Sequence, residues 1–403
     1  MIDVKTAEEL VKRYCIKLKT ELVHLSDLGG RVLSSPIKSA RVQPPFNRVA
    51  MDGIAIRYKD RNLKSFELKG IQKAGSPPLT INSEKVAIEI MTGAPLPKGF
   101  DTVVPYERIQ IENGIAKLEE AYPIEEKQNI HFEGSDYSEG KILLEKGLRL
   151  NSAAIAIIAS QGLEKAEVYK LPKIAIISTG DELIEPGKAC EPWQIWKSNV
   201  FAIQSELKSF GVPEKNITLF HLEDKREEVF ENLKKILNEY DGLIISGGVS
   251  MGKYDFVQAV MNDLGVEQIF YKITQKPGKP MFFGKGQNSQ AVFALPGNPV
   301  SALVCMRRYV IPSLESSLKS QAKVNYVQLT EDISFKKEFS FFKAVKIHSN
   351  KNAELLATPI SSNGSGDFSS LGGSDGFIEL PAEDPIHKAG DSFKFFPWKG
   401  GVL

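Results

Sequence analysis

Short apolar runs alternate with amphipathic stretches across residues 171–320. Residues 174–177 and 243–245 are runs of aliphatic, largely β-branched residues, a pattern typical of buried strands in a parallel sheet. A helix is expected from Ser198, with its apolar residues on one face and Gly211 just beyond its end. Strands that alternate with helices are joined by parallel crossovers, so this region predicts a doubly wound α/β domain.

The alternation continues along the same region. The further elements that we expect are a strand at 216–220, a helix opening at Asp224, a strand at 291–294 and a helix from Pro299. The apolar residues of the first two helices fall on single faces, Val200, Ile203, Leu207 and Phe210 in one and Val229, Leu233, Ile236 and Leu237 in the other. Three of the four predicted strands are therefore followed by a helix that can pack against the sheet.

The remaining regions lack this rhythm. The first begins with an amphipathic helix, whose start we expect at a capping box of Thr6 and Glu9, and then becomes extended. Two others are short strands punctuated by glycine-rich turns. We therefore predict four regions: an N-terminal linker region at 1–45 that resumes at 137–170 with a helix at 151–160, an inserted β-rich lid domain at 46–136, the α/β domain at 171–320, and a small C-terminal β-barrel or sandwich at 321–403.

Composition narrows the range of partners. The chain has 403 residues and a formal net charge of +1, so bulk electrostatics gives no basis for binding nucleic acid, and an anionic substrate needs a local site. No apolar run approaches the roughly 20 residues that span a bilayer, and the polar N-terminus does not read as a signal peptide. The three cysteines and five histidines are scattered without disulfide or ligand spacing, which favours a cytoplasmic protein without a zinc site.

Loops rich in glycine and hydroxyl residues follow three of the predicted strands. These loops are Ser178-Thr179-Gly180-Asp181-Glu182, Ser246-Gly247-Gly248-Val249-Ser250 and Pro296-Gly297-Asn298-Pro299-Val300-Ser301. A single loop of this kind is often only a turn that needs glycine for a positive φ. Three of them at the carboxyl ends of one sheet, each leading toward a helix N-terminus, favour a phosphorylated or nucleotide ligand.

Charged residues in the same set suit such a ligand. Lys276-Pro277-Gly278-Lys279-Pro280 places two positive charges at another strand end, on a loop stiffened by proline, where we expect phosphate contacts. Cleavage of a phosphoanhydride usually needs Mg²⁺ held by one or two carboxylates. The candidate ligands are Asp181, Glu182 and Asp255, each of which is equally suited to a helix N-cap when taken alone.

Two further motifs lie in the predicted lid domain. Ala50-Met51-Asp52-Gly53 places an acid before a glycine, and Met91-Thr92-Gly93-Ala94-Pro95 has the composition of a rigid turn. From the residues alone, neither motif has an assigned role.

Together these motifs resemble the molybdopterin molybdenumtransferase family, which includes the bacterial MoeA proteins and the E domain of gephyrin. The matching segments, in family order and at family-like spacing over nearly the whole chain, are residues 50–53, 91–95, 178–183, 246–250, 276–280 and 295–301. The resemblance implies a multidomain, elongated subunit with a MogA-like α/β domain and a C-terminal β-barrel. It also implies an enzyme that inserts molybdate into adenylylated molybdopterin with Mg²⁺, releasing AMP and giving the molybdenum cofactor.

The resemblance further implies a homodimer with an active cleft between the α/β domain of one subunit and the lid of the other. Carried over position by position, the catalytic candidates are Asp52, Thr92, Asp136 and Glu182, and the metal candidates are Asp181, Glu182 and Asp255. The substrate-binding candidates are Ser178, Thr179, Gly180, Asp181, Gly247, Gly248, Ser250, Lys276, Lys279, Pro296, Gly297, Asn298, Pro299 and Ser301. The expected partners are small anionic substrates, the molybdopterin adenylyltransferase and molybdoenzyme maturation factors, with neither nucleic acid nor a membrane.

The chain departs from the family pattern at three places. Where the family usually reads Phe-Asp-Asn-Ser, residues 46–49 read Phe-Asn-Arg-Val, which loses an acid and a hydroxyl and introduces Arg48. Where the family usually has an aspartate, Lys197 reverses the charge, and this either changes how Mg²⁺ is held or adds a contact to an oxyanion. Lys343 stands where the family often has an arginine, which keeps the charge but gives up bidentate geometry.

Three other functions remain open from the sequence. The α/β domain alone resembles the adenylyltransferases of this pathway, and ATP consumption without molybdate would indicate that activity. A scaffold of the gephyrin E type would bind partner peptides without any cofactor. A paralogue with altered metal handling, for example for tungstate, is consistent with the three departures.

Overall fold

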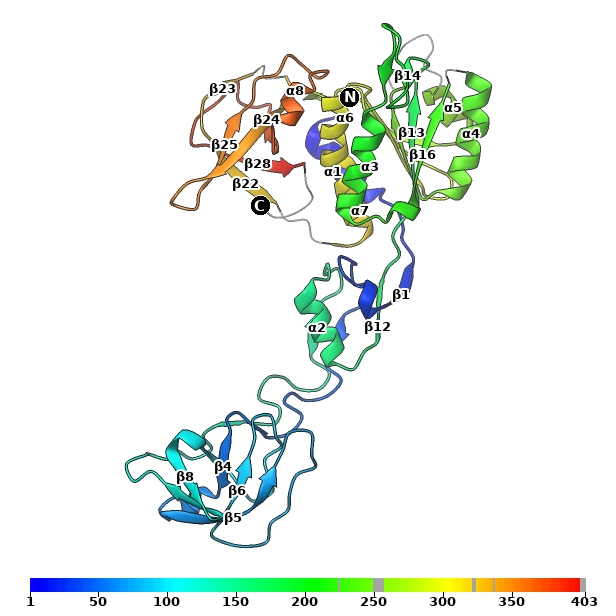
Figure 1. Ribbon diagram of the computed structural model, residues 1–403. Coiled ribbons are helices and arrows are strands. Elements are labelled where there is room, and N and C mark those ends of the chain that lie inside the picture. The colour runs from blue at the N-terminus through cyan, green and yellow to red at the C-terminus, as the bar shows by residue number, and fades with distance from the viewer. Residues whose placement is uncertain (224, 249–256, 321–323, 336–337, 399–403) are drawn as a thin grey trace. The chain divides into compact units, whose positions relative to one another are not determined.

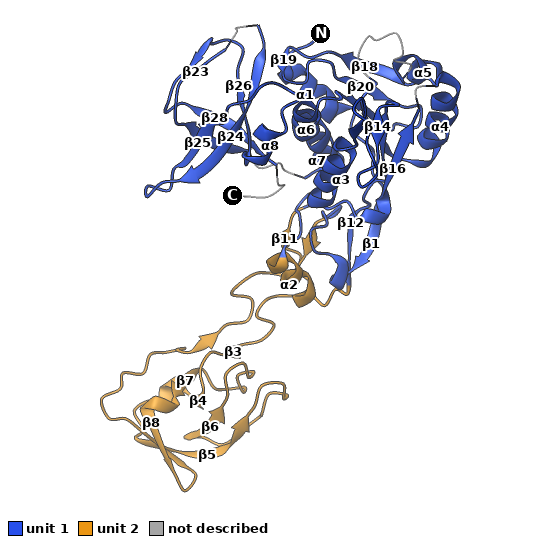
Figure 2. Cartoon of the chain, turned by 45° about the horizontal axis from the view of Figure 1, so that its top comes forward, with its two compact units in different colours: residues 1–35, 146–151, 165–403 blue, residues 36–145, 152–164 orange. Residues whose placement is uncertain are grey.

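The fold comes from a computed structural model that describes residues 1–403 except 224, 249–256, 321–323, 336–337 and 399–403. The chain divides into two compact units (Figure 2). Unit 1 comprises residues 1–35, 146–151 and 165–403, and unit 2 comprises residues 36–145 and 152–164. None of the described helices is both long and apolar enough to cross a lipid bilayer.

A six-stranded sheet forms the centre of unit 1. In spatial order its strands are β16 (Ile217–Leu222), β13 (Ile174–Thr179), β17 (Gly242–Ser246), β21 (Ala291–Leu295), β20 (Phe282–Lys285) and β18 (Glu267–Tyr271). The first four strands are parallel, as predicted, but β20 runs antiparallel to both of its neighbours. The regular alternation of strands and helices did not predict this reversal, because no helix separates β18 from β20.

Helices lie on both faces of this sheet (Figure 1). The helices on one side are α3 (Asn199–Phe210), α6 (Pro299–Cys305), α7 (Ile311–Ser317) and α1 (Val4–Arg13), and those on the other are α4 (Arg226–Glu239) and α5 (Val257–Asp263). Side chains of β13 enter the apolar cores on both faces of the sheet. Ile174 and Ile176 pack in the core on the α3 side, whereas Ala175 and Ile177 pack in the core on the α4 side. This alternation confirms the predicted doubly wound domain.

Three helix boundaries were predicted from local sequence signals. Helix α3 ends at Gly211, whose φ of 108° satisfies the predicted left-handed cap. The capping box predicted at Thr6 and Glu9 is wrong, because α1 starts earlier and the carboxylate of Asp3 accepts a hydrogen bond from the Thr6 N–H at 2.8 Å. The predicted helix start at Asp224 lies outside the described residues, and α4 begins at Arg226.

Segments far apart in the sequence pair to form the linker region. In unit 1, β1 (Thr20–His24) pairs with β12 (Lys165–Tyr169); in unit 2, β2 (Ile37–Lys38) pairs with β11 (Ile142–Leu144). Helix α2 (Ser152–Ser160) follows, near the range predicted for it. The N-terminal region and its resumption therefore lie side by side, while the domain limits themselves stay predictions.

Unit 2 is built on a second six-stranded sheet. In spatial order its strands are β7 (Thr102–Pro105), β4 (Gly53–Ile56), β6 (Val86–Ile90), β5 (Ser65–Gln72), β9 (Ile115–Leu118) and β8 (Ile109–Glu112). A short ladder joins β3 (Arg48–Val49) to β10 (Ile130–His131). Ile54 and Ala55 of β4 enter different apolar clusters, so both faces of the sheet pack against apolar side chains.

The C-terminal part of unit 1 is a closed barrel. Its strands are β22 (Asn325–Leu329), β25 (Leu355–Pro359), β24 (Ser340–Ser349), β26 (Gly376–Leu380) and β28 (Ser392–Pro397), and pairing of β24 with β26 closes the ring. This closure decides between the predicted barrel and sandwich in favour of the barrel. The short strand β19 (Gln275–Lys276), which comes from the α/β domain, adds to β24 in parallel.

The remaining elements are short. They are the strands β14 (Leu183–Ile184), β15 (Ile195–Trp196), β23 (Ile333–Ser334) and β27 (Ile386–His387), the helix α8 (Ser369–Gly372), the 3₁₀ turns η1 (Leu25–Asp27), η2 (Tyr58–Asp60), η3 (Tyr106–Arg108) and η4 (Glu214–Asn216), and the π-helical turn η5 (Met306–Val310) between α6 and α7.

Candidate functional site

The three glycine- and hydroxyl-rich loops start from neighbouring strands at one edge of the α/β sheet. Strand register places Ser178 opposite Ser246, and Ser246 opposite Leu295, at the carboxyl ends of β13, β17 and β21. The N–H of Gly247 donates to the carbonyl of Leu295 at 3.2 Å, which ties the second loop to the third. The structure therefore confirms the predicted position of these loops, at the edge where open α/β sheets usually bind their ligands.

The first loop has a buried start and an exposed end. Ser178 and Thr179 are buried, and the Ser178 hydroxyl lies 3.2 Å from the carbonyl of Phe220 and 3.0 Å from Nδ1 of His221. Gly180 has a φ of +128°, and a Cβ atom there would lie 2.5 Å from the carboxylate of Glu182. Glycine at this position therefore allows Glu182 to fold back over the loop, beside the strand end.

Two residues outside the predicted set contact these loops: Asn199 links the second loop to the third, and Ser365 contacts the third loop alone. Asn199, at the start of α3, donates from Nδ2 to the hydroxyl of Ser246 at 2.9 Å and to the carbonyl of Gly297 at 2.7 Å. Asn298 donates from Nδ2 to the hydroxyl of Ser365 at 2.8 Å. Ser365 lies on a loop between elements of the barrel region. Asn199 sits next to a family motif and could have been found there, whereas Ser365 lies in a Gly-rich stretch that predicts only a turn.

The segment at residues 276–280, which we call the lysine loop, lies at the same edge of the sheet. Strand β18 runs antiparallel to β20, which runs antiparallel to β21, so β18 ends where β21 ends. Lys276 and Lys279 are exposed on this loop, with their ammonium groups 5.5 Å from the ring centres of Phe335 and Phe339 respectively. The α/β domain thus supplies the charges, and the barrel region supplies the aromatic side chains beside them.

Lys343 adds a third cation from the barrel. Its ammonium group lies 6.0 Å from the ring centre of Phe341, and burial lowers the pKa of Lys343 from its ordinary value. The ring of Phe341 stacks on that of Phe335 at 4.0 Å between centres, next to Lys276. Lys343 and Lys276 therefore flank one aromatic pair, an arrangement that neither residue's sequence context predicted.

Asp181 and Glu182 are the described metal candidates. Both are exposed at the end of β13, and two adjacent carboxylates suit Mg²⁺, which usually takes its other ligands from substrate phosphates and water. Across the described part of the chain, no group of three or more His, Cys, Asp or Glu residues is placed to hold a metal ion by itself. The remaining predicted residues of this cluster, Ser250 and Asp255, lie outside the described residues.

Lys197 forms an ion pair with Glu185, which lies earlier in the segment between β13 and α3. Strands β14 and β15 form a parallel pair between β13 and α3, and Lys197 follows directly after β15. The Lys197 side chain is only 6% exposed, and its Nζ donates to a carboxylate oxygen of Glu185 at 2.5 Å. That hydrogen bond is the main cause that lowers the pKa of Glu185, so the Glu185 carboxylate balances the charge of the buried Lys197 side chain.

Asp52 and Thr92 lie together in unit 2. The Thr92 N–H donates to Oδ1 of Asp52 at 2.5 Å, and hydrogen bonds from Thr92 lower the pKa of the exposed Asp52 carboxyl. The following glycine is required, because a Cβ atom on Gly53 would lie 2.0 Å from the carbonyl oxygen of Val104 on the adjacent strand. Close pairing of β4 with β7 thus fixes the position of Asp52.

Asp136 is held by a histidine that the sequence did not single out. Nε2 of His131 lies 2.7 Å from Oδ1 of Asp136, and a guanidinium nitrogen of Arg48 lies 3.1 Å from Nδ1 of the same ring. Arg48 and His131 are direct cross-strand partners on β3 and β10. Because a guanidinium only donates, Nδ1 must accept, and the Nε2–H is then directed at the Asp136 carboxylate.

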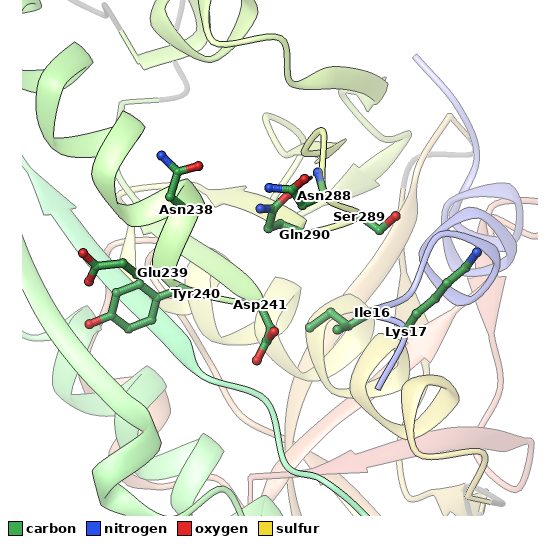
Figure 3. A pocket seen from close by; sticks show the side chains of 9 residues that line it. All are labelled: Ile16, Lys17, Asn238, Glu239, Tyr240, Asp241, Asn288, Ser289 and Gln290. Carbon is green, nitrogen blue, oxygen red and sulfur yellow. Dashed lines mark hydrogen bonds between the residues drawn. The ribbon is translucent and has the colours of Figure 1, made fainter. Parts of the chain in front are cut away.

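A cavity of about 330 Å³ lies at the opposite edge of the α/β sheet (Figure 3). Asp241 and Gln290 line it immediately before β17 and β21 begin, together with Ile16, Lys17 and Tyr240. Its position at the amino ends of the parallel strands separates it from the loops described above, so it plays no part in the candidate site.

Known families match the chain in three consecutive segments. Residues 2–162 match the MoeA N-terminal region (domain I and II), residues 175–316 a probable molybdopterin binding domain, and residues 326–398 the MoeA C-terminal region (domain IV). Among curated proteins, the chain is 37% identical to the molybdopterin molybdenumtransferase of Synechocystis sp., over 99% of this chain and 100% of the relative. It is 32% identical to that of Haemophilus influenzae, over 94% of both chains.

Solved structures show the same relationship. The molybdopterin biosynthesis MoeA protein from Pyrococcus horikoshii OT3 superposes with a TM-score of 0.81 at 28% identity, covering 98% of this chain and 100% of that one. Similarity therefore extends over the α/β domain, the β-rich insertion and the barrel together. With the motifs quoted above in place, the chain belongs to the molybdopterin molybdenumtransferase family.

Proposed function

We propose that this chain inserts molybdenum from molybdate into adenylylated molybdopterin, releasing AMP and giving the molybdenum cofactor. One observation carries the proposal: the three glycine- and hydroxyl-rich loops and the lysine loop meet at one edge of the α/β sheet. Such an edge suits a ligand with several phosphates, because backbone N–H groups and two lysines can face it. Membership of the transferase family supports the choice of reaction.

The chemistry that the site must assist is the meeting of two anions. Molybdate approaches a pterin that already bears a negative phosphoanhydride, and the dithiolene sulfurs bind the metal. Lys276, Lys279 and Lys343 would offset the repulsion between the two anions at the start of the reaction. An oxygen from water or molybdate would replace the broken P–O bond on the pterin phosphate, and the loop N–H groups would stabilise the charge that grows on the departing AMP.

Mg²⁺ is proposed at the carboxylates of Asp181 and Glu182. Bound there, the ion would polarise the phosphoanhydride and neutralise part of its charge. Glu182 folds back beside Gly180, so its carboxylate stays next to the loop that would contact the phosphate. Lys197 does not need to serve as an oxyanion contact, since Glu185 balances its charge.

Molybdate-dependent release of AMP from adenylylated molybdopterin, measured with Mg²⁺ present, tests this function. The wild-type chain should release AMP only when molybdate is added. Glu182→Ala and Asp52→Ala should each lower the rate by at least about a hundredfold while leaving the chain folded. Consumption of ATP without molybdate would favour the adenylyltransferase, and binding of partner peptides by an inactive chain would favour the scaffold.

We further propose that the chain works as a homodimer. The support is the family resemblance, and light scattering of the purified protein measures the state directly. Mixing Asp52→Ala with Glu182→Ala chains tests whether the two carboxylates serve one site from different copies, since mixed dimers would then regain activity. Cys15, Cys190 and Cys305 are all unpaired, which supports the reducing cytoplasm as the location.

A further inference from the structure

We propose that Gln275 and Tyr309 are positioning residues, which hold the lysine loop in the shape that presents Lys276 and Lys279 to the phosphoanhydride. The inference rests on the proposed function, because it deepens the role of the same loop. Neither residue belongs to the motifs that connect the chain with its family.

Tyr309 lies directly beneath the lysine loop. It belongs to the π-helical turn η5, where one extra residue per turn interrupts the helix that follows the third loop. Its side chain is completely buried, and its hydroxyl donates a hydrogen bond to Oε1 of Gln275. Burial raises the pKa of Tyr309 well above its ordinary value, so the hydroxyl stays protonated and remains a donor.

Gln275 passes this contact on to the loop backbone. It is only 1% exposed, and its Nε2 donates to the carbonyls of Pro277 at 3.0 Å and Gly278 at 3.3 Å. Carbonyl oxygens only accept, so the amide must turn its Nε2 toward the loop and its Oε1 toward Tyr309. The tyrosine hydroxyl therefore fixes the one amide orientation that can hold the loop.

Gly278 shows how closely the loop is seated. It has a φ of +91°, and a Cβ atom there would lie 2.7 Å from Sγ of Cys305 and 2.7 Å from Nε2 of Gln275. The buried Gly278 separates Lys276 from Lys279, both of which are exposed. The backbone between the two lysines is thus packed against the domain, while their charges point outward.

A fixed backbone matters because long side chains lose entropy when they are ordered on a ligand. A loop whose backbone between the two lysines is already fixed loses less freedom when a phosphoanhydride binds. Pairing of β19 with β24 and the aromatic rings beside each lysine hold the outer side of the loop. The Tyr309–Gln275 pair holds the inner side of the loop. Among the described residues, Gln275 is the one whose side-chain amide donates to the backbone of this loop.

The test is Tyr309→Phe, which removes one buried hydroxyl and keeps the ring. We expect about tenfold weaker binding of adenylylated molybdopterin, measured by pterin fluorescence, and a KM for it raised by the same factor with little change in kcat. Gln275→Asn, whose shorter amide cannot reach both carbonyls, should show the same pattern. Direct binding keeps the test independent of turnover, so a chain that binds but releases no AMP would overturn the proposed function alone.

Tyr240→Phe is the matched control. The Tyr240 hydroxyl donates to that of Thr218 at 2.9 Å near the opposite edge of the sheet, so the same chemical change there should leave binding within twofold. Placing Tyr309→Phe in a Lys276→Ala/Lys279→Ala background distinguishes positioning from general packing. If Tyr309 acts through the lysines, its effect should shrink to less than about twofold. Wild-type affinity in Tyr309→Phe, or an undiminished loss without the lysines, would overturn the proposal.

Discussion

Arg48 in unit 2 and Lys197 in unit 1 are both cations at positions where the family usually has asparagine or aspartate, and they differ in how they are surrounded. Lys197 is buried, with a side chain 6% exposed, and is paired directly with Glu185. Arg48 is half-buried and contacts Nδ1 of His131, whose ring and whose partner Asp136 are 39% and 40% exposed.

The difference in burial gives the two cations different roles: the charge of Lys197 must be neutralised, whereas the charge of Arg48 orients the His131 ring. A buried ammonium without a partner is costly to the fold, so the Lys197–Glu185 pair is expected to matter mainly for stability. Water can solvate Arg48 and His131, so their pairing contributes little stability and acts mainly on the direction of the Asp136 carboxylate.

The largest effect is expected for Glu185→Ala. The change leaves the Lys197 ammonium buried without its carboxylate, and we expect a loss of about 2 kcal/mol in the free energy of unfolding, less than for a fully buried pair because Glu185 itself is half-exposed. Urea denaturation measures it. Glu214→Ala is the matched control, since its pair with Lys208 is exposed and should contribute less than about 0.5 kcal/mol. Equal losses in the two variants would contradict the importance of burial.

A smaller effect, on activity rather than stability, is expected for His131→Leu. Removing the ring frees the Asp136 carboxylate from its donor, and we expect AMP release to slow about tenfold, equivalent to roughly 1.4 kcal/mol, while the unfolding free energy changes little. His348→Leu, at an exposed position of barrel strand β24, is the control. An unchanged rate in His131→Leu would show that the orientation of Asp136 is unimportant.

Arg48→Met should have a weaker effect in the same direction. Without the guanidinium, Nδ1 of His131 can carry the proton, and the fraction of rings that donate to Asp136 falls. We expect about a threefold slower rate, roughly 0.6 kcal/mol, with Arg48→Lys retaining a donor and most of the activity. Nitrogen NMR of the histidine ring would report the change of tautomer; a rate loss without that change would contradict the explanation.

The smallest effect concerns the acid stability of unit 1. Because the hydrogen bond from Lys197 lowers the pKa of Glu185 below 4.5, the pair stabilises the fold above that pH and loses its contribution as the pH falls through the lower, folded-state value. Exposure of Glu185 screens the pair, so the difference should stay under about 0.5 kcal/mol. Wild type should therefore lose more stability than Glu185→Ala between neutral pH and pH 3, and parallel curves would refute the pairing.

Local patterns predicted the elements because their causes are local. The apolar face of α3 and the glycine after it fixed that helix to within one residue, and the runs at 174–177 and 243–245 are central strands. The capping box at Thr6 failed because Asp3 offered a competing cap one turn earlier. The direction of β20 could not be read from periodicity, since an antiparallel and a parallel buried strand have the same apolar pattern.

By itself the sequence determined the family, the doubly wound domain and the loops that follow its strands, because each motif and each predicted element is a short run of neighbouring residues. Only the tertiary structure decided which partners those residues have. Lys197 and Glu185 are 12 residues apart in the chain, Arg48 and His131 are 83 residues apart, and Tyr309 and Gln275 are 34 residues apart. Hydrogen bonds and ion pairs act over a few ångströms of space whatever the separation in sequence, so packing alone brings these groups together.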